Sequence, residues 1–401
     1  MKGYLPSNLN LGAEKHSDKY YYIITMLYYG RIFDKRRTRE SFIPLYSKIL
    51  HSVLSNYRRY LNDLIENGVI ETNNQYRVGE ESKGYRLTPK YANVKFREVQ
   101  IRDKRINEKI ICFREKQKQK IKLNQHRYIY DCLEKVSMDV EGARSLIEVS
   151  NLNEYEYSSY SISVDMIESQ TWFQTVDSTA GRVHNNITNL SKKLRPFLRY
   201  ENKPLVEVDV RNSQPFFFNL LIRDYFNPPS PSVSLPSFPT FLPYVTKSKT
   251  ECTDLELYRE LTSTGEFYEY LMKKTGYNEC RKNFKIRFFK NVFYSKENDN
   301  YMSADRKMFK HLFPTVAKIV SFYKKDDHRV LARLLQKAEA DIMINKIVPR
   351  LADKGIYCLT IHDSILTTPE NSEIVKTIML DEFQNSLGFT PTIRIKKCLE
   401  E

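Results

Sequence analysis

The sequence predicts an α+β fold with a small N-terminal domain, a basic helical middle region and a larger C-terminal domain that mixes strands and helices. Residues 17–90 combine apolar segments of helical spacing with short strand-like segments. Leu205–Val210 and Tyr357–Leu366 have the pattern of strands, and each carries one aspartate. Between them, Arg281–Tyr294 repeats charged and aromatic residues every four positions, as a helix does. The domain boundaries that we expect are 1–91, 92–176 and 177–401.

Composition indicates a polyanionic partner. Among 401 residues, 64 Lys and Arg stand against 49 Asp and Glu, a formal net charge of +15. Nucleic acid is the commonest partner of such a chain, and an anionic membrane surface is the alternative. No apolar run is long enough to span a bilayer, and the N-terminus lacks the apolar segment of a signal peptide, so we expect no membrane partner and a cytoplasmic location. None of the six cysteines forms a CxxC pair, which favours reduced thiols.

The N-terminal domain has the pattern of helices followed by a small hairpin. Asn67-Gly68 ends the last helix, and Ser55 is its expected N-cap. Helices are expected at 20–29, 44–54 and 57–65, and strands at 69–71, 75–78 and 84–87. This order resembles a winged helix-turn-helix, which implies that Arg58 and Arg59 lie on a recognition helix in a DNA major groove. The alternative is a small helical domain with a solvated basic face.

Two further segments are defined by composition. Residues 92–135 are dense in Lys and Arg, and we expect them to be helical, either as a solvated face or as a helix that follows phosphates. Residues 227–250 hold six of the sixteen prolines, which predicts a loop or linker.

Two acids on strands form the first candidate site. Alternation along Leu205–Val210 places Glu207 and Asp209 on one face of a strand. Asp363 lies within the second strand-like segment, where an ionised carboxylate needs a cation, a close partner or the exposure of a hairpin tip. Two carboxylates on adjacent strands can hold two Mg²⁺ about 3.5–4 Å apart, with Mn²⁺ as a substitute. Taken singly, each acid could equally be a surface or structural charge.

The predicted basic helix supplies positive charge. Arg281, Lys285, Phe289 and Phe293 recur every four residues and should form one stripe, with two cations leading to two rings. Such a stripe can take a triphosphate at one end and stack a base at the other. The alternative is an ordinary amphipathic helix with phenylalanines in the core.

These segments, in this order, resemble the palm and fingers of family A polymerases, the group of DNA polymerase I-type enzymes and single-subunit phage-type RNA polymerases. The likeness covers about residues 177–370. It rests on five segments: Thr179-Ala180-Gly181-Arg182, Val208–Gln214, Arg281–Tyr294, Gln336 with Ala340-Asp341-Ile342, and Ile361-His362-Asp363-Ser364. The resemblance implies a right-hand polymerase palm, an antiparallel sheet with helices, and helical fingers at about 223–300.

The resemblance also implies a role for each matching residue. Metal ligands would be Asp209, Asp363 and the backbone carbonyl of Val210. Triphosphate would be bound by Arg281 and Lys285, and the nucleotide would be contacted by Phe289, Phe293, Tyr294 and Gln214. Primer-template duplex would be contacted by Arg182, Gln336 and His362.

Several positions depart from the DNA-polymerase pattern. Gln214 stands where those enzymes carry a Glu that blocks the ribose 2′-hydroxyl. Ser364 follows the motif aspartate, as in the RNA enzymes, and Phe293-Tyr294 replaces the usual Tyr-Gly. These departures leave the choice between ribose and deoxyribose open.

The sequence therefore predicts a template-directed nucleotidyltransferase, with a DNA polymerase that lacks proofreading as the first choice. A primase or RNA polymerase of the single-subunit type and an untemplated strand-extending enzyme are alternatives. A non-catalytic DNA-binding replication initiator or regulator with a degenerate palm is the alternative of a different class. Expected partners are DNA, possible RNA, nucleoside triphosphates and accessory replication proteins.

Overall fold

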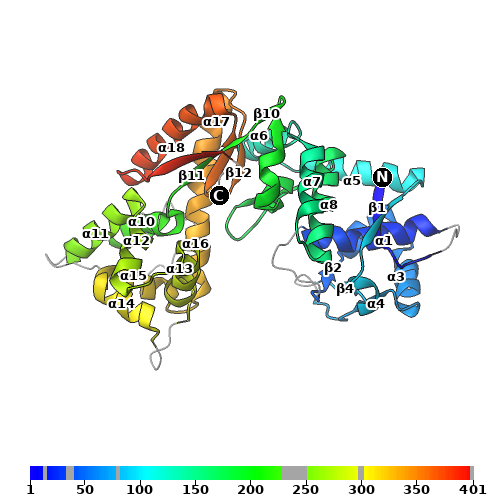
Figure 1. Cartoon of the computed structure of the whole chain (residues 1–401), viewed down its shortest axis with the longest axis horizontal. Coiled ribbons are helices and arrows are strands. Elements are labelled where there is room, and N and C mark those ends of the chain that lie inside the picture. Colours follow the sequence, from blue (N-terminus) through cyan, green and yellow to red (C-terminus); the bar gives the residue numbers. More distant parts are fainter. Residues whose placement is uncertain (12–15, 33–39, 78–81, 228–250, 297–301, 398–401) are drawn as a thin grey trace. The chain divides into compact units, whose positions relative to one another are not determined.

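A computed structural model describes residues 1–11, 16–32, 40–77, 82–227, 251–296 and 302–397. Residue contacts divide the chain into two compact units. Unit 1 comprises Met1–Thr175 and His184–Pro204, and unit 2 comprises Val176–Val183 and Leu205–Glu401. Helices and small antiparallel sheets make up both units, as expected for an α+β fold (Figure 1). The predicted middle region, 92–176, lies almost entirely in unit 1, together with the predicted N-terminal domain.

Near its N-terminus, unit 1 has three helices beside a three-stranded sheet. The helices are α1 (Ser17–Ile32), α2 (Ser47–Val53) and α3 (Tyr57–Glu66). The strands are β2 (Ile43–Pro44), β3 (Ile70–Thr72) and β4 (Gly84–Leu87), in the order β2-β4-β3. In α3, Tyr57, Leu61 and Leu64 recur at helical spacing and are buried. Gly68, with φ of +63°, then turns the chain into β3.

The predicted hairpin differs from the observed one. We expected residues 75–78 to pair with the first strand, but β4 pairs with β3, with Ile70 opposite Leu87. The side chain of Asn73 explains the longer connection, because its Oδ1 accepts hydrogen bonds from the backbone N–H of Gln75 (3.1 Å) and of Gly84 (3.0 Å). Residue 78 lies outside the described part. The expected N-cap Ser55 is also wrong, since Asn56 holds that position.

The rest of unit 1 is mainly helical. Its first strand, β1 (Lys2–Pro6), pairs with β5 (Phe96–Gln100), so the start of the basic segment is a strand where we expected helix. Asp103 then caps α5 through the backbone N–H groups of residues 105 and 106. The other elements are α4 (Pro89–Ala92), α5 (Lys104–Gln119), α6 (Asn124–Leu133), β6 (Ser137–Met138), α7 (Val140–Val149), α8 (Glu154–Glu168), β7 (Gln174–Val176), β8 (Val183–Asn185), α9 (Asn186–Asn189), η1 (Lys192–Phe197), β9 (Leu198–Tyr200) and β10 (Lys203–Pro204).

Unit 2 is built on a four-stranded antiparallel sheet. Its strands are β11 (Val206–Val210), β12 (Leu359–Ile361), β13 (Ser364–Thr367) and β14 (Ile393–Lys397), in the order β12-β13-β11-β14. The valines of β11 are buried, whereas Glu207 and Asp209 alternate with them and are half-buried. Helix α18 (Ser372–Leu387) packs on β11 and β14, beside the sheet in Figure 1. Alternation in β11 therefore places both acids on one face, as the sequence predicts.

Helices of unit 2 surround a core rich in phenylalanine. They are α10 (Ser213–Phe226), α11 (Glu251–Thr264), α12 (Phe267–Thr275), α13 (Arg281–Phe288), the π-helix η3 (Phe289–Phe293), α14 (Ala304–Leu312), α15 (Pro314–Lys324), α16 (Arg329–Ala340), the π-helix η4 (Asp341–Ile347), α17 (Val348–Asp353) and η5 (Pro369–Asn371). The expected loop at 227–250 falls almost wholly outside the described residues. In the ranges described above, no helix has both the length and the apolarity needed to cross a membrane.

Candidate active site

The two candidate metal ligands lie on strand β11 and in the turn that precedes its neighbour β13. Asp209 is opposite Ser364 in the β11–β13 ladder, and the backbone N–H of Val210 donates to the carbonyl of Asp363 (3.3 Å). Asp363 occupies the two-residue turn between β12 and β13. His362, with φ of +55°, makes this turn and is exposed. The hairpin tip thus removes the need to bury Asp363 within a strand.

The electrostatics of Asp209 reflect this placement. Burial raises the pKa of the Asp209 carboxyl above its usual range, and the negative charge of Asp363 raises it further. The ammonium of Lys396, on β14, contacts Oδ2 of Asp209 and opposes both effects. A cation bound beside these two carboxylates would stabilise the charged form of Asp209. Lys396 was missed by the sequence analysis, and alternation along β14 was the only available signal.

The donor set suits a hard cation. Within the described ranges, no three or more His, Cys, Asp or Glu side chains cluster as a metal site. A metal here would have the carboxylates of Asp209 and Asp363, with backbone carbonyl, water and phosphate oxygens completing the shell. Mg²⁺ is commonly held by one or two carboxylates in this way, together with substrate phosphates. The residues present therefore fit Mg²⁺.

A hydrogen-bonded network orients the first cation of the basic helix. Arg281 donates through Nε to Oε1 of Glu269 (2.8 Å) and through Nη2 to Oδ1 of Asn212 (2.5 Å). Arg211 donates to the same Oε1 (2.6 Å). Although partial burial opposes it, a backbone N–H and both arginines lower the pKa of Glu269. Because Arg211 and Asn212 directly follow β11, this network connects the strand of Asp209 to the start of α13.

Glu269 is a second residue that the sequence analysis missed. It lies on α12, outside every motif, and its partners become visible only when α12 packs against α13.

The cations of α13 lie next to aromatic rings. The guanidinium of Arg281 is 5.1 Å from the centre of the Tyr268 ring, and the ammonium of Lys285 is 5.9 Å from the centre of the Phe289 ring. Phe289 stacks on Tyr294 with the ring centres 5.2 Å apart and the planes at 18°. Cations are thus followed by aromatic rings along this element, which matches the phosphates and the base of a nucleotide.

The π-helix η3 changes which ring follows Phe289. The backbone N–H of Tyr294 donates to the carbonyl of Phe289 (2.8 Å), five residues earlier, so the turn contains one additional residue. Phe293 consequently points into the core, with 0 % of its surface exposed, and contacts Phe218 and Phe288. Phe293 still contacts Phe289, with the ring centres 5.8 Å apart, but its burial removes it from the surface that the expected stripe would offer to a nucleotide.

Tyr294 occupies the position that was expected for Phe293. Its hydroxyl donates to Oε1 of Gln214 (2.8 Å), and burial raises its pKa to about 12, so it stays protonated and can donate at neutral pH. Gln214 lies on α10 and Tyr294 directly follows η3, so this hydrogen bond joins two residues that were each predicted to contact the nucleotide.

A buried ion pair lies behind Gln214. Arg182 contacts Oε1 of Glu339 (2.7 Å), and Nε2 of Gln214 is 3.5 Å from the other carboxylate oxygen. Burial raises the pKa of Glu339 to about 8, although Arg182 acts in the opposite direction. Arg182 follows a tight turn in which Gly181 has φ of +73°. Glu339 was missed because an acid in a helix is usually a surface charge.

Three other residues were predicted to contact nucleic acid. Gln336 is half-buried on α16. Arg58 and Arg59 are exposed on α3 in unit 1, where they line a depression of about 700 Å³ between α2 and α3. Lys48 and His51 line the same depression, which is therefore basic.

Comparisons with known proteins place few limits on this chain. No family model matches it, and no curated protein matches it. Among solved structures, it is similar to the POL domain of Pol1 from M. smegmatis in complex with DNA primer-template and dNTP. The identity is 11 %, the TM-score is 0.31, and the match covers 64 % of this chain and 55 % of that one. A likeness at this level carries no inference about activity, which must rest on this chain's own residues.

Proposed function

We propose that this protein is a template-directed nucleotidyltransferase that adds nucleotides to a 3′-hydroxyl, with DNA synthesis as the first choice. One observation supports this most directly: Asp209 lies on β11 and Asp363 in the turn before the neighbouring strand β13, and the network through Asn212 and Glu269 connects this sheet to Arg281 on α13. Acids that can hold metal and cations that can hold phosphate thus come from connected elements of one unit.

The acids and the cations have separate roles in this proposal. Asp209, Asp363 and the Val210 carbonyl would hold two Mg²⁺, or Mn²⁺, and the bound metals would supply activation of the hydroxyl and neutralisation of phosphate charge. Arg281, oriented by Glu269, and Lys285 would bind the triphosphate and stabilise the negative charge that develops during transfer. Their fixed orientation reduces the reorganisation needed when the nucleotide binds.

The aromatic residues would position the nucleotide. Phe289 and Tyr294 offer a stacked pair of rings beside Lys285, and a base stacks well on such a surface. Gln214 holds the Tyr294 hydroxyl, so this pair is the candidate for contact with the sugar. Because Gln214 carries no charge, RNA or primer synthesis remains the alternative activity, and untemplated extension is a further one.

Other residues would contact nucleic acid. Arg182, Gln336 and His362 are the candidates for duplex contacts in unit 2. In unit 1, the three helices and the sheet of order β2-β4-β3 would act as a winged helix, with exposed Arg58 and Arg59 on the helix that would enter a major groove. Accessory replication proteins are possible further partners of such an enzyme.

A primer-extension assay tests the proposal. Wild-type protein and the Asp363→Asn variant receive Mg²⁺, a labelled primer-template and either dNTPs or NTPs, with one lane that lacks primer. Extension with dNTPs that is lost in the variant supports a DNA polymerase. Products from NTPs without primer would change the activity to that of an RNA polymerase or primase. Extension without template would identify an untemplated enzyme.

A non-catalytic DNA-binding regulator is the second candidate, and the contact between Lys396 and Asp209 favours it. In a degenerate site, a lysine could take over the charge balance that metal provides elsewhere. Such a regulator would incorporate nothing under any condition, would bind duplex DNA tightly, and would tolerate Asp209→Ala.

A further inference from the structure

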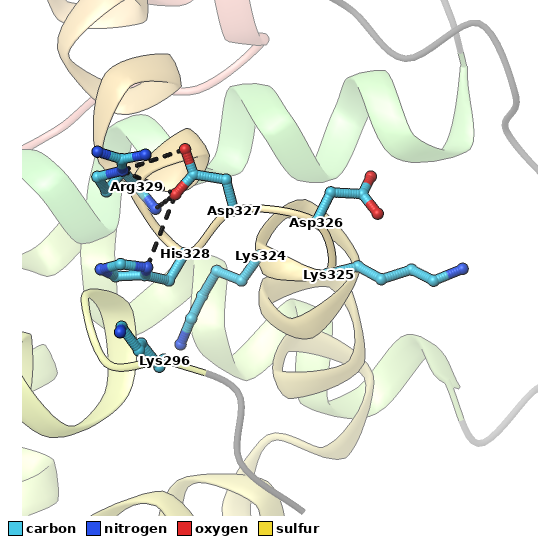
Figure 2. A pocket seen from close by; sticks show the side chains of 7 residues that line it. All are labelled: Lys296, Lys324, Lys325, Asp326, Asp327, His328 and Arg329. Atoms are coloured by element: carbon cyan, nitrogen blue, oxygen red, sulfur yellow. Dashed lines mark hydrogen bonds and ion pairs between the residues drawn. The ribbon is translucent and has the colours of Figure 1, made fainter.

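A second basic site lies in unit 2, outside the candidate active site. A depression of about 590 Å³ forms where α15 ends and α16 begins, next to the segment that follows η3. Seven residues line it: Lys296, Lys324, Lys325, Asp326, Asp327, His328 and Arg329 (Figure 2). Three of these residues are lysines, one is an arginine and one is a histidine, and the other two are aspartates.

The side chains are arranged so that positive groups gather on one side. Figure 2 shows the ends of Lys296, Lys324 and His328 pointing toward the same region, while Lys325 and Asp326 point away from it. The remaining acid, Asp327, is engaged by Arg329 (3.0 Å) and by Arg333 (2.8 Å). The lining is therefore basic where the three side chains meet.

Lys324 is the most deeply buried of the three converging side chains. Only 1 % of its surface is exposed, and its Nζ donates to the carbonyl of Val292 (2.8 Å) and to Oγ of Ser295 (3.3 Å). Burial lowers the pKa of this ammonium to about 7, and the charge of Arg306 lowers it further. Because the positive charge of Arg306 disfavours the charged form of Lys324, a bound anion would favour that form.

We propose that Lys296, Lys324 and His328 form a binding site for a phosphate group. Phosphate accepts several charge-assisted hydrogen bonds at once, which matches two lysine side chains and a histidine ring that converge. Nδ1 of His328 lies 3.6 Å from a carboxylate oxygen of Asp327. The three residues of this site are distinct from those assigned to the candidate active site.

Two sources could supply the phosphate, namely the backbone of a nucleic-acid strand or a free polyphosphate. Through Val292, the same Lys324 also holds η3, the element that begins with Phe289 and sets the position of Tyr294. Phosphate binding at this site would thus be coupled to the aromatic pair, whichever source supplies it.

Calorimetric titration with inorganic pyrophosphate tests the site, carried out in an Arg281→Ala, Lys285→Ala background so that the candidate active site cannot bind the probe. In this background we compare Lys296→Gln and His328→Gln with Lys325→Gln, which removes the same charge from the neighbouring side chain that points away. Lys296 and Lys325 are both exposed, so both variants should fold, as thermal unfolding would show.

The proposal predicts that Lys296→Gln and His328→Gln weaken binding about tenfold, while Lys325→Gln changes it less than twofold. Repeating the comparison with a single-stranded oligonucleotide identifies the source, since loss for the oligonucleotide alone indicates a backbone phosphate. Carbon-13 NMR of labelled lysine gives a second readout, in which the pKa of Lys324 rises from about 7 on binding. Equal effects of all three substitutions on both probes, or no effect on either, would overturn the proposal.

Discussion

Replacing Lys396 by methionine should change how strongly the protein depends on divalent metal. Lys396 contacts Oδ2 of Asp209, where a metal would also bind, so the ammonium and the metal compete for one carboxylate. Methionine keeps the length of the side chain and removes the charge. The variant should therefore bind Mg²⁺ more tightly and be less stable without it.

The size of the effect follows from the exposure of the pair. The side chain of Asp209 is 20 % exposed and that of Lys396 is 40 % exposed, so solvent screens the interaction in part. Exposed pairs contribute about 0.2–1 kcal/mol, and breaking a fully buried pair costs about 3–5 kcal/mol. An intermediate pair corresponds to about 1–1.5 kcal/mol, which is roughly a fivefold to tenfold change in Mg²⁺ affinity.

Thermal unfolding at increasing Mg²⁺ concentration measures both effects. We expect Lys396→Met to unfold at a lower temperature without metal and to reach half of its metal-induced stabilisation at a severalfold lower Mg²⁺ concentration. Lys397→Met is the matched control, because it changes the same residue type on the same strand at a position that alternation directs to the other face. A higher Mg²⁺ requirement in Lys396→Met than in wild type would refute the reasoning, since Lys396 would then support the metal site.

Three further predictions concern unit 2. Tyr294→Phe removes the hydrogen bond to Gln214 and should cost about 0.5–1.5 kcal/mol of stability. It should also alter the ratio of dNTP to NTP incorporation in competition assays, and an unchanged ratio would show that this pair does not select the sugar. Phe293→Ala should cost about 3–5 kcal/mol in denaturant unfolding, whereas Phe289→Ala should cost clearly less and weaken nucleotide binding; equal stability losses would contradict the assignment. The pKa of Lys324 is about 7 in the folded state, below its unfolded value, so the unfolded state binds more protons between pH 7 and about pH 10. The free energy of unfolding should therefore rise with pH across this window, and it should rise less in Lys324→Met. Parallel pH profiles of the two proteins would exclude Lys324 as the cause.

Local patterns in the sequence predicted much of the fold of unit 2. Alternating valines and acids specify β11, because the side chains of a strand point to opposite faces in turn. The same reasoning placed Asp209 on a strand and named a hairpin tip as one solution for Asp363, and the structure has that turn. The helical spacing of Arg281 and Lys285 likewise predicted α13.

Only the tertiary structure showed which charged side chains surround the predicted site residues. Lys396, Glu269 and Glu339 approach the predicted residues from distant parts of the chain, and nothing in their local sequence distinguishes them from surface charges. The lowered pKa of Glu269 and the raised pKa of Glu339 arise from burial and from partners that only packing supplies.

The sequence by itself determined strand β11, helix α13 and the order in which acids, cations and rings follow one another in unit 2, because period and side-chain type are local properties. It did not determine that Tyr294, and not Phe293, stacks on Phe289. The choice between these two rings depends on the π-turn of η3. In this turn Phe293 packs in the core and Tyr294 donates a hydrogen bond to Gln214. A turn with one additional residue leaves no periodic signal in the sequence, so only the packed structure shows which ring faces the site.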